Sequence, residues 1–143
     1  MEPPRRKWTD LCPIEKGSKK MGLKFQVADV VKPLIAVKRL TEKGNVVHFG
    51  PREEDCYIQN VSSGSKLALK PNGPGSYLMF VKFEGGMETE IVVDSGAEEN
   101  VCPKWWGSSF GLDKADKQLH LRSAGGNVIE HYGQRAVIVT SPF

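Results

Sequence analysis

The chain has 143 residues, of which 39% are hydrophobic and 26% charged, as expected for one soluble globular domain. No apolar run approaches the roughly 20 residues that cross a bilayer, and residues 1–20 contain no apolar stretch that could act as a secretory signal. We therefore expect a cytoplasmic protein without a membrane partner. Its cysteines, Cys12, Cys56 and Cys102, are widely spaced and odd in number, which predicts reduced thiols rather than disulfides or metal ligands.

The positive charge is concentrated at the N-terminus. Residues 1–24 hold seven basic and three acidic side chains, whereas the net charge of the whole chain is +3. Residues 1–22 also contain several prolines and glycines and lack apolar periodicity, so we predict a basic, flexible leader. A basic segment can bind nucleic acid, here through residues 5–24, but a solvated leader is the simpler interpretation.

Short apolar segments separated by turn sequences follow the leader. Pro33 stands at a suitable first helical position, and Leu34, Val37 and Leu40 recur at three-residue steps, which predicts one short helix over residues 33–44. The other apolar segments predict strands over residues 23–31, 45–49, 56–60, 66–70, 76–83, 87–94 and 118–122, and hairpin strands over residues 127–141. The pattern indicates a mainly-β barrel or sandwich.

The most informative segment is a buried strand that ends in a carboxylate. Residues 91–97 read Ile-Val-Val-Asp-Ser-Gly-Ala, so the apolar run stops at Asp94. Ser95 offers a hydroxyl donor, and Gly96 lets the backbone come close and leaves its N–H free to bind a carboxylate oxygen. The sequence therefore predicts a carboxylate in a dry, hydrogen-bonded setting.

A carboxylate of this kind becomes useful for hydrolysis when a second one lies beside it. Two carboxylates about 3 Å apart do not both ionise and therefore share one proton. One can then activate water while the other polarises the scissile carbonyl. The sequence contains a single Asp-Ser-Gly, at Asp94, so the partner would come from a second copy across a twofold axis. This predicts a homodimer that needs no metal or organic cofactor.

The motif resembles the hydrophobic-hydrophobic-Asp-Ser/Thr-Gly-Ala signature of retropepsin-like aspartic proteases. VVDSGAEENVCP is similar to the active-site strand of copia-type retrotransposon proteases, and LHLRSAGG followed by HYGQRAVIV resembles the segment after it. The resemblance implies an acid-protease barrel that forms half of a homodimer, with Asp94 catalytic and Ser95, Gly96 and Ala97 supporting it. It also implies a flap hairpin over residues 119–139 that closes over an extended peptide or polyprotein substrate. Residues near the flap tip would be Ala124, Gly125, Gly126 and Asn127.

The resemblance spans about residues 23–143 but in reversed order. Residues 23–83 are similar to the half that follows the flap and the region downstream of it, and residues 84–143 to the catalytic half. Ala36 stands where retroviral proteases have the glycine of an Ile-Leu-Gly segment. Three explanations of the order stay open. In the first, the chain is a circular permutant, which is tolerated when domain termini lie close together. In the second, it is a fragment that joins two protease units. In the third, it is one of two chains that exchange halves.

A catalytically inactive, transposon-derived remnant is the alternative function. It would act as a peptide-binding or dimerisation module. Asp29 also ends an apolar strand, but no Ser/Thr-Gly follows it, so we expect a surface role. Cys102 with His120 or His131 would be a thiol–imidazole pair, yet no spacing requires it, and we favour a buried thiol and surface histidines.

Two pairs of residues after the motif complete the set of candidates. Glu98 and Glu99 follow it directly, and we expect them in a solvated turn. Trp105 and Trp106 are expected to pack on the core or on the dimer interface.

Overall fold

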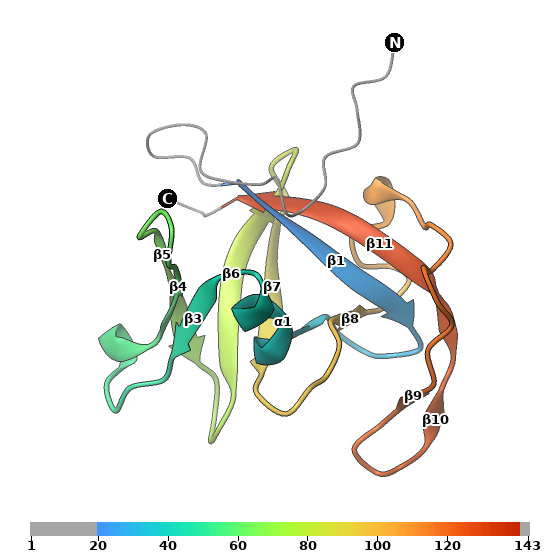
Figure 1. Ribbon diagram of the computed structural model, residues 1–143, viewed down its shortest axis with the longest axis horizontal. Helices are drawn as coiled ribbons and strands as arrows, with labels where there is room; N and C mark the ends of the chain where they lie inside the picture. Colours follow the sequence, from blue (N-terminus) through green and yellow to red (C-terminus); the bar gives the residue numbers. More distant parts are fainter. Residues whose placement is uncertain (1–19, 141–143) are drawn as a thin grey trace.

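The computed structural model describes residues 20–140 and folds them mainly into strands (Figure 1). The strands are β1 (Lys20–Ala28), β2 (Leu34–Ala36), β3 (Asn45–His48), β4 (Tyr57–Asn60), β5 (Lys66–Pro71), β6 (Tyr77–Phe83), β7 (Glu88–Asp94), β8 (Val101–Cys102), β9 (Leu121–Arg122), β10 (Val128–Ile129) and β11 (His131–Thr140). Within these residues there is one α-helix, α1 (Val37–Glu42), and there are two 3-10 turns, Glu53–Asp55 and Ser108–Phe110. The predicted mainly-β class with one short helix is confirmed.

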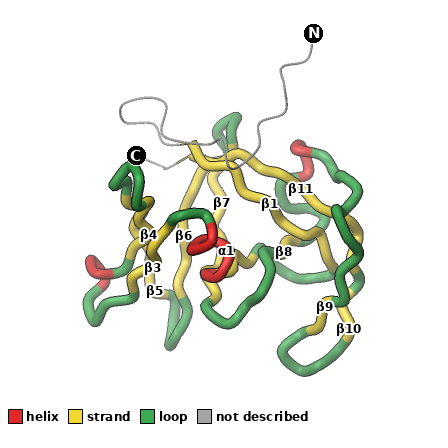
Figure 2. The backbone as a smooth tube through the Cα atoms, in the orientation of Figure 1, coloured by secondary structure: helices red, strands yellow, loops and turns green. Residues whose placement is uncertain are grey.

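Nine strands form one sheet in the order β11-β1-β8-β2-β7-β6-β5-β4-β3, and β9 pairs with β10 separately. An additional pairing between β11 and β6 joins the first six strands of this order into a closed circuit of pairings. The remaining strands, β5, β4 and β3, continue beyond β6 as an antiparallel meander (Figure 2). Strands from residues 23–83 and from residues 84–143 alternate within the circuit, so both halves of the sequence share one sheet.

The longest strand pair joins the two ends of the described chain. β1 runs antiparallel to β11, with Lys20 opposite Thr140 at one end and Ala28 opposite His131 at the other. Side chains alternate along β11, so that Val137 and Val139 are buried while their neighbours are partly exposed. Residues that are far apart in sequence therefore become neighbours over the whole length of this pair.

Three aromatic rings fill the core where β1, β6 and the segment after β8 meet. The Trp106 ring contacts Phe25 at 4.7 Å and Phe83 at 4.9 Å between centroids. Its Nε1 donates to Thr89 Oγ1 at 2.8 Å, which satisfies the indole N–H of a side chain that is only 2% exposed. Trp106 is thus the core residue that the sequence predicts. Trp105 is 66% exposed, so it is not a core residue of the single chain, and its alternative place on a dimer interface stays a prediction.

The boundary predicted for the N-terminal leader is wrong by at least three residues. Lys20, Met21 and Gly22 belong to β1 and pair with residues 138–140 of β11, because the ladder with β11 supplies partners that the local sequence does not reveal. Residues 1–19 lie outside the described part, and so does most of residues 5–24, for which nucleic-acid binding is the less favoured interpretation. Within the described part, the Lys24 amine forms an ion pair with Asp116 at 2.7 Å.

The short helix is confirmed in place but not in length. It covers residues 37–42 instead of 33–44, because Leu34, Ile35 and Ala36 pair with β7 instead of winding into a helix. The preceding strand likewise ends at Ala28 instead of residue 31. No helix within residues 20–140 has the length and apolar character that crossing a membrane requires.

The flap-like hairpin is shorter than the sequence predicts. β9 and β10 pair only through residues 121–122 and 128–129, and the predicted strand over residues 118–122 shrinks to β9. Residues 131–140 pair with β1 instead of continuing the hairpin, because that ladder satisfies a long row of backbone groups. The turn between β9 and β10 contains Gly126 with φ of 86°, a conformation that glycine adopts without steric cost.

Candidate active site

Asp94 is the last residue of β7. Ile91 and Val93 of this strand are buried, and the alternation leaves Asp94 half-buried at the strand end. The Gly96 N–H donates to Asp94 Oδ1 at 2.8 Å, as the motif predicts. Ser95 and Gly96 are exposed and Ala97 is half-buried. The carboxylate is therefore fixed by the backbone of its own loop and accessible from one side.

Strand β2 runs parallel to β7 and ends level with Asp94. Leu34 pairs with Val92, Ile35 with Val93 and Ala36 with Asp94, and α1 begins immediately afterwards. The two halves of the sequence thus meet at the candidate catalytic residue. Ala36 is fully buried, so this position lies against the core and not against solvent.

Asn100, which is 7% exposed, connects the strands β1 and β2 to the loop that follows the motif. Its Oδ1 accepts from the Ala36 N–H at 2.8 Å, and its Nδ2 donates to the Lys24 carbonyl at 3.0 Å. The Gln26 N–H donates to the carbonyl of Asn100 itself at 2.8 Å. One amide side chain from the loop after Asp94 therefore links β1 to β2. Sequence reasoning missed this residue, because its partners are remote in the chain.

We expect replacement of Asn100 by leucine to lower the free energy of unfolding by about 2–4 kcal/mol, because the buried Ala36 N–H and Lys24 carbonyl lose their partners while the side-chain volume stays similar. Urea denaturation measures the change. Asn72→Leu, at an exposed turn, is the matched control and should cost less than about 0.5 kcal/mol. A stability of Asn100→Leu equal to that of the control would contradict this assignment.

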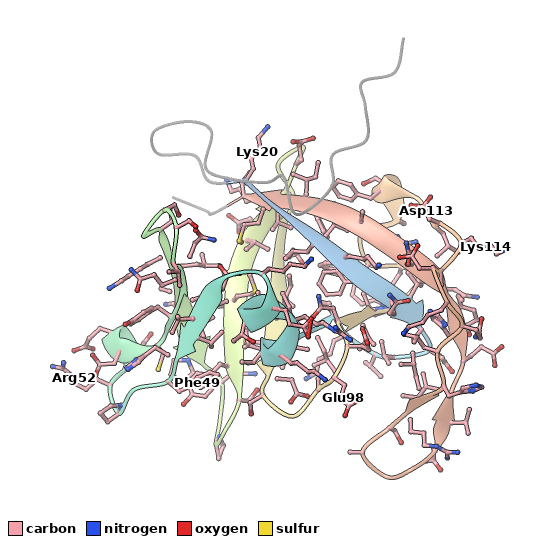
Figure 3. The ribbon with its side chains drawn as sticks, viewed as in Figure 1. Lys20, Phe49, Arg52, Glu98, Asp113 and Lys114 are labelled. Atoms are coloured by element: carbon pink, nitrogen blue, oxygen red, sulfur yellow. The ribbon has the colours of Figure 1, made fainter. Side chains whose placement is uncertain are left out.

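Arg39 of α1 holds the loop after the motif. Its Nε donates to the Glu98 carbonyl at 3.0 Å, and its guanidinium also binds the Glu99 carboxylate and Glu42 Oε2, the latter at 2.9 Å. Hydrogen bonding to Glu99 is the main reason that the pKa of Arg39 is raised. Glu99 is therefore an ion-pair partner instead of part of the solvated turn that the sequence predicts, whereas Glu98 is exposed (Figure 3).

The residues predicted for the flap tip lie in the turn between β9 and β10. Ala124, Gly125, Gly126 and Asn127 are all exposed. Hydrogen bonds within the hairpin shape this turn: Ser123 N–H donates to the Asn127 carbonyl at 2.9 Å, and Arg122 donates to the Gly126 carbonyl at 3.0 Å. Among the described residues no hydrogen bond joins this turn to Asp94.

A polar hollow of about 330 Å³ lies between α1, β1 and the segment before β9. Of the described residues in its lining, Leu119 alone is apolar. The other lining residues are charged or carry amides: Lys24, Gln26, Arg39, Glu42, Lys43, Glu99, Asn100, Asp116, Lys117 and Gln134. Asp94 does not belong to this lining. The candidate catalytic carboxylate therefore lies outside this hollow.

The other candidate residues have structural surroundings. Cys102 is buried, and burial raises the pKa of its thiol to about 12, although Arg135 acts in the opposite direction, so the thiol stays protonated at neutral pH. His131 is half-buried and hydrogen-bonded to Gln26, Gly133 and Leu119, which corrects its prediction as a surface histidine. His120 and Asp29 are exposed, as expected. No group of three or more His, Cys, Asp or Glu residues within residues 20–140 is arranged to hold a metal ion.

No known family model, curated protein or solved structure significantly matches this chain. The likeness to retropepsin-like proteases therefore remains a prediction from the motif and the segments around it.

Proposed function

We propose that this chain is one half of an aspartic endopeptidase, in which two copies each contribute Asp94. The observation that carries the proposal is the setting of this carboxylate. It ends a buried strand, accepts the Gly96 N–H at 2.8 Å and stays half-exposed, while β2 runs parallel beside it up to Ala36. A carboxylate that is fixed by its own loop and open on one side is suited to meet a twin.

In the proposed reaction the two Asp94 carboxylates share one proton. The ionised carboxylate removes a proton from water, and the protonated one donates a hydrogen bond to the scissile carbonyl, so that the hydroxide equivalent adds to the carbonyl carbon. A carboxyl group then delivers a proton to the leaving amine and the C–N bond breaks. Gly96 keeps each Oδ1 in place, and the exposed Ser95 hydroxyl is available to donate across the twofold interface.

We further propose that the fold is a permuted form of the retropepsin-like barrel. The closed circuit of six strands supports this proposal, and so does the parallel pair of β2 and β7 followed at once by α1. The pairing of Lys20 with Thr140 places the ends of β1 and β11 side by side, which is the arrangement that a circular permutation requires. Under this proposal a single chain supplies both halves of one subunit.

The substrate in this proposal is an extended peptide, such as a retrotransposon polyprotein, that lies between the Asp94 loop and the hairpin of β9 and β10. The exposed hairpin turn offers backbone groups that could pair with such a peptide. We expect apolar side chains on either side of the cleaved bond.

The test uses the purified full chain and a library of internally quenched peptides between about pH 4 and 7, the range that a shared-proton carboxylate pair suggests. We expect the cleavage rate per chain to rise with chain concentration and to level off when the solution mass reaches that of two chains. A rate per chain that is independent of concentration in a monomer would overturn the two-copy site.

A stable dimer that binds peptides without cleaving them would favour the alternative, a non-catalytic peptide-binding or dimerisation module. The observation that supports this alternative is that Asp94 does not line the polar hollow described above.

A further inference from the structure

His131 begins β11 and is hydrogen-bonded through both ring nitrogens. Its Nδ1 lies 3.2 Å from the backbone nitrogen of Leu119. Its Nε2 lies 2.8 Å from Gln26 Oε1 and 3.1 Å from the Gly133 carbonyl. The imidazole thus connects the segment before β9 with β1 and β11, elements that are remote in the sequence.

These contacts allow only one neutral form of the ring. The Leu119 N–H is a donor, so Nδ1 must accept, and the proton of a neutral imidazole must be on Nε2. There it can be donated to Gln26 Oε1 or to the Gly133 carbonyl, both of which lie on the Nε2 side. The neutral ring therefore accepts from Leu119 and donates its one proton to the two acceptors on the Nε2 side, shared or one at a time.

Protonation of the ring breaks one contact and keeps the others. A proton on Nδ1 would point at the Leu119 N–H, so two donors would face each other across 3.2 Å. The Nε2 contacts survive, because Nε2 already donates. The loss falls on Leu119 alone.

Loss of the hydrogen bond from the Leu119 N–H to His131 affects the hairpin of β9 and β10. β9 and β10 form a sheet of their own, apart from the nine-stranded one. On one side the hairpin is tied to the body of the protein through the Glu130 carbonyl, which accepts from the Asp29 N–H at 3.0 Å. On the other side the Leu119 N–H to His131 is the tie nearest to β9.

We propose that His131 is a pH-sensitive positioning residue for the hairpin of β9 and β10. In the neutral form it anchors the N-terminal side of the hairpin through Leu119, and in the protonated form it releases that side while the Asp29 tie persists. The release itself is independent of proteolysis. The functional consequence of the release, a flap that opens in acid to admit peptide, rests on the proposed function.

The segments that contact His131 carry the following charged residues close in sequence to the contacts: Lys24, Asp29, Asp113, Asp116, Lys117 and Glu130. Lys24 is paired with Asp116 at 2.7 Å, and Asp113 lies along β11, opposite Gln134 (Figure 3). Lys114, Lys117 and His120 are exposed to solvent. Burial, followed by the charges of Asp29 and Glu130, raises the pKa of the neighbouring Tyr132. Histidine side chains in general change charge between about pH 5 and 8, and the two pH values of the test are chosen to span most of that range.

The test measures hydrogen-exchange protection of the Leu119 amide in the full chain by NMR, at pH 7.5 and pH 5, each corrected for the intrinsic exchange rate. In the wild-type chain we expect protection of Leu119 to fall about tenfold in acid, the factor that one ordinary hydrogen bond corresponds to. The Asp29 amide is the internal control and should keep its protection. Imidazole nitrogen shifts should report the Nε2–H form at pH 7.5.

Two matched variants separate the roles of the two nitrogens. His131→Asn places an amide oxygen near the position of Nδ1, so Leu119 should stay protected at both pH values. His131→Gln places an amide nitrogen near the position of Nε2, so Leu119 should be poorly protected at both. An Nδ1–H form at pH 7.5, or equal protection of Leu119 in the wild type at both pH values, would overturn the proposal. Since none of these measurements involves cleavage, their outcome is separate from that of the peptidase test.

Discussion

Asp94→Asn is expected to lower peptide cleavage by about 10²–10⁴-fold, the usual contribution of a positioned acid–base group. An amide cannot take up the proton of water, while its shape and the acceptor oxygen for the Gly96 N–H are retained. The variant should therefore fold with unchanged stability. Initial rates with a quenched peptide, together with urea denaturation, measure the two quantities separately.

Asp29→Asn is the matched control for this loss. Asp29 is an exposed carboxylate one residue beyond the end of β1, so its replacement should leave the cleavage rate within about twofold of the wild type. Equal losses in both variants would point to a general effect of charge instead of a catalytic one.

Mixing experiments then test whether the two carboxylates act as a pair. When wild-type and Asp94→Asn chains are mixed in equal amounts and allowed to exchange, about one quarter of the dimers carry two aspartates. If catalysis needs both, the mixture should show about a quarter of the rate of wild-type protein at the same total concentration. A rate of one half would mean that each chain works with its own carboxylate.

Local patterns in the sequence predicted the elements but not their partners. The alternation of apolar residues located the strands from β3 to β7 with small errors at their ends, and the Asp-Ser-Gly string located the carboxylate and its Gly96 contact. By contrast, the three-residue spacing of Leu34, Val37 and Leu40 predicted helix where β2 begins. The ladder with β7 decided this conformation, and its partner residues lie 58 positions along the chain.

The polar residues around the candidate site were missed for the same reason. Asn100 binds a backbone group 64 positions away, and His131 binds Gln26 across 105 positions. Arg135 did carry a local signal. It stands in step with Val137 and Val139 on β11, all three being buried, so strand periodicity could have predicted that this cation points inward.

Arg135→Met is expected to lower the free energy of unfolding by about 3–5 kcal/mol, the largest stability effect that we predict. Arg135 is 4% exposed, and its guanidinium donates to the carbonyls of Gly111 at 2.6 Å, Lys104 at 3.0 Å and Trp106 at 2.6 Å. Methionine has a similar volume but no donor, so these three carbonyls would lose their common partner. Urea denaturation followed by tryptophan fluorescence measures the change.

Two opposing effects decide whether this replacement stabilises or destabilises the fold. Burying a cation costs several kcal/mol, and an apolar replacement removes that cost. Here, however, three carbonyl groups accept hydrogen bonds from the guanidinium, and these bonds hold residues 104–111 against β11. Methionine would leave the three carbonyls unsatisfied. We therefore expect the lost hydrogen bonds to destabilise the fold by more than removal of the buried charge stabilises it. Arg135→Lys keeps the charge but its amine reaches fewer carbonyls, so its free energy of unfolding should lie between those of the wild type and Arg135→Met. Arg122→Met, at an exposed arginine with one carbonyl partner, should cost less than about 0.5 kcal/mol. If Arg135→Met were as stable as the wild type, the cost of burying the cation would be at least as large as the stabilisation from its three hydrogen bonds.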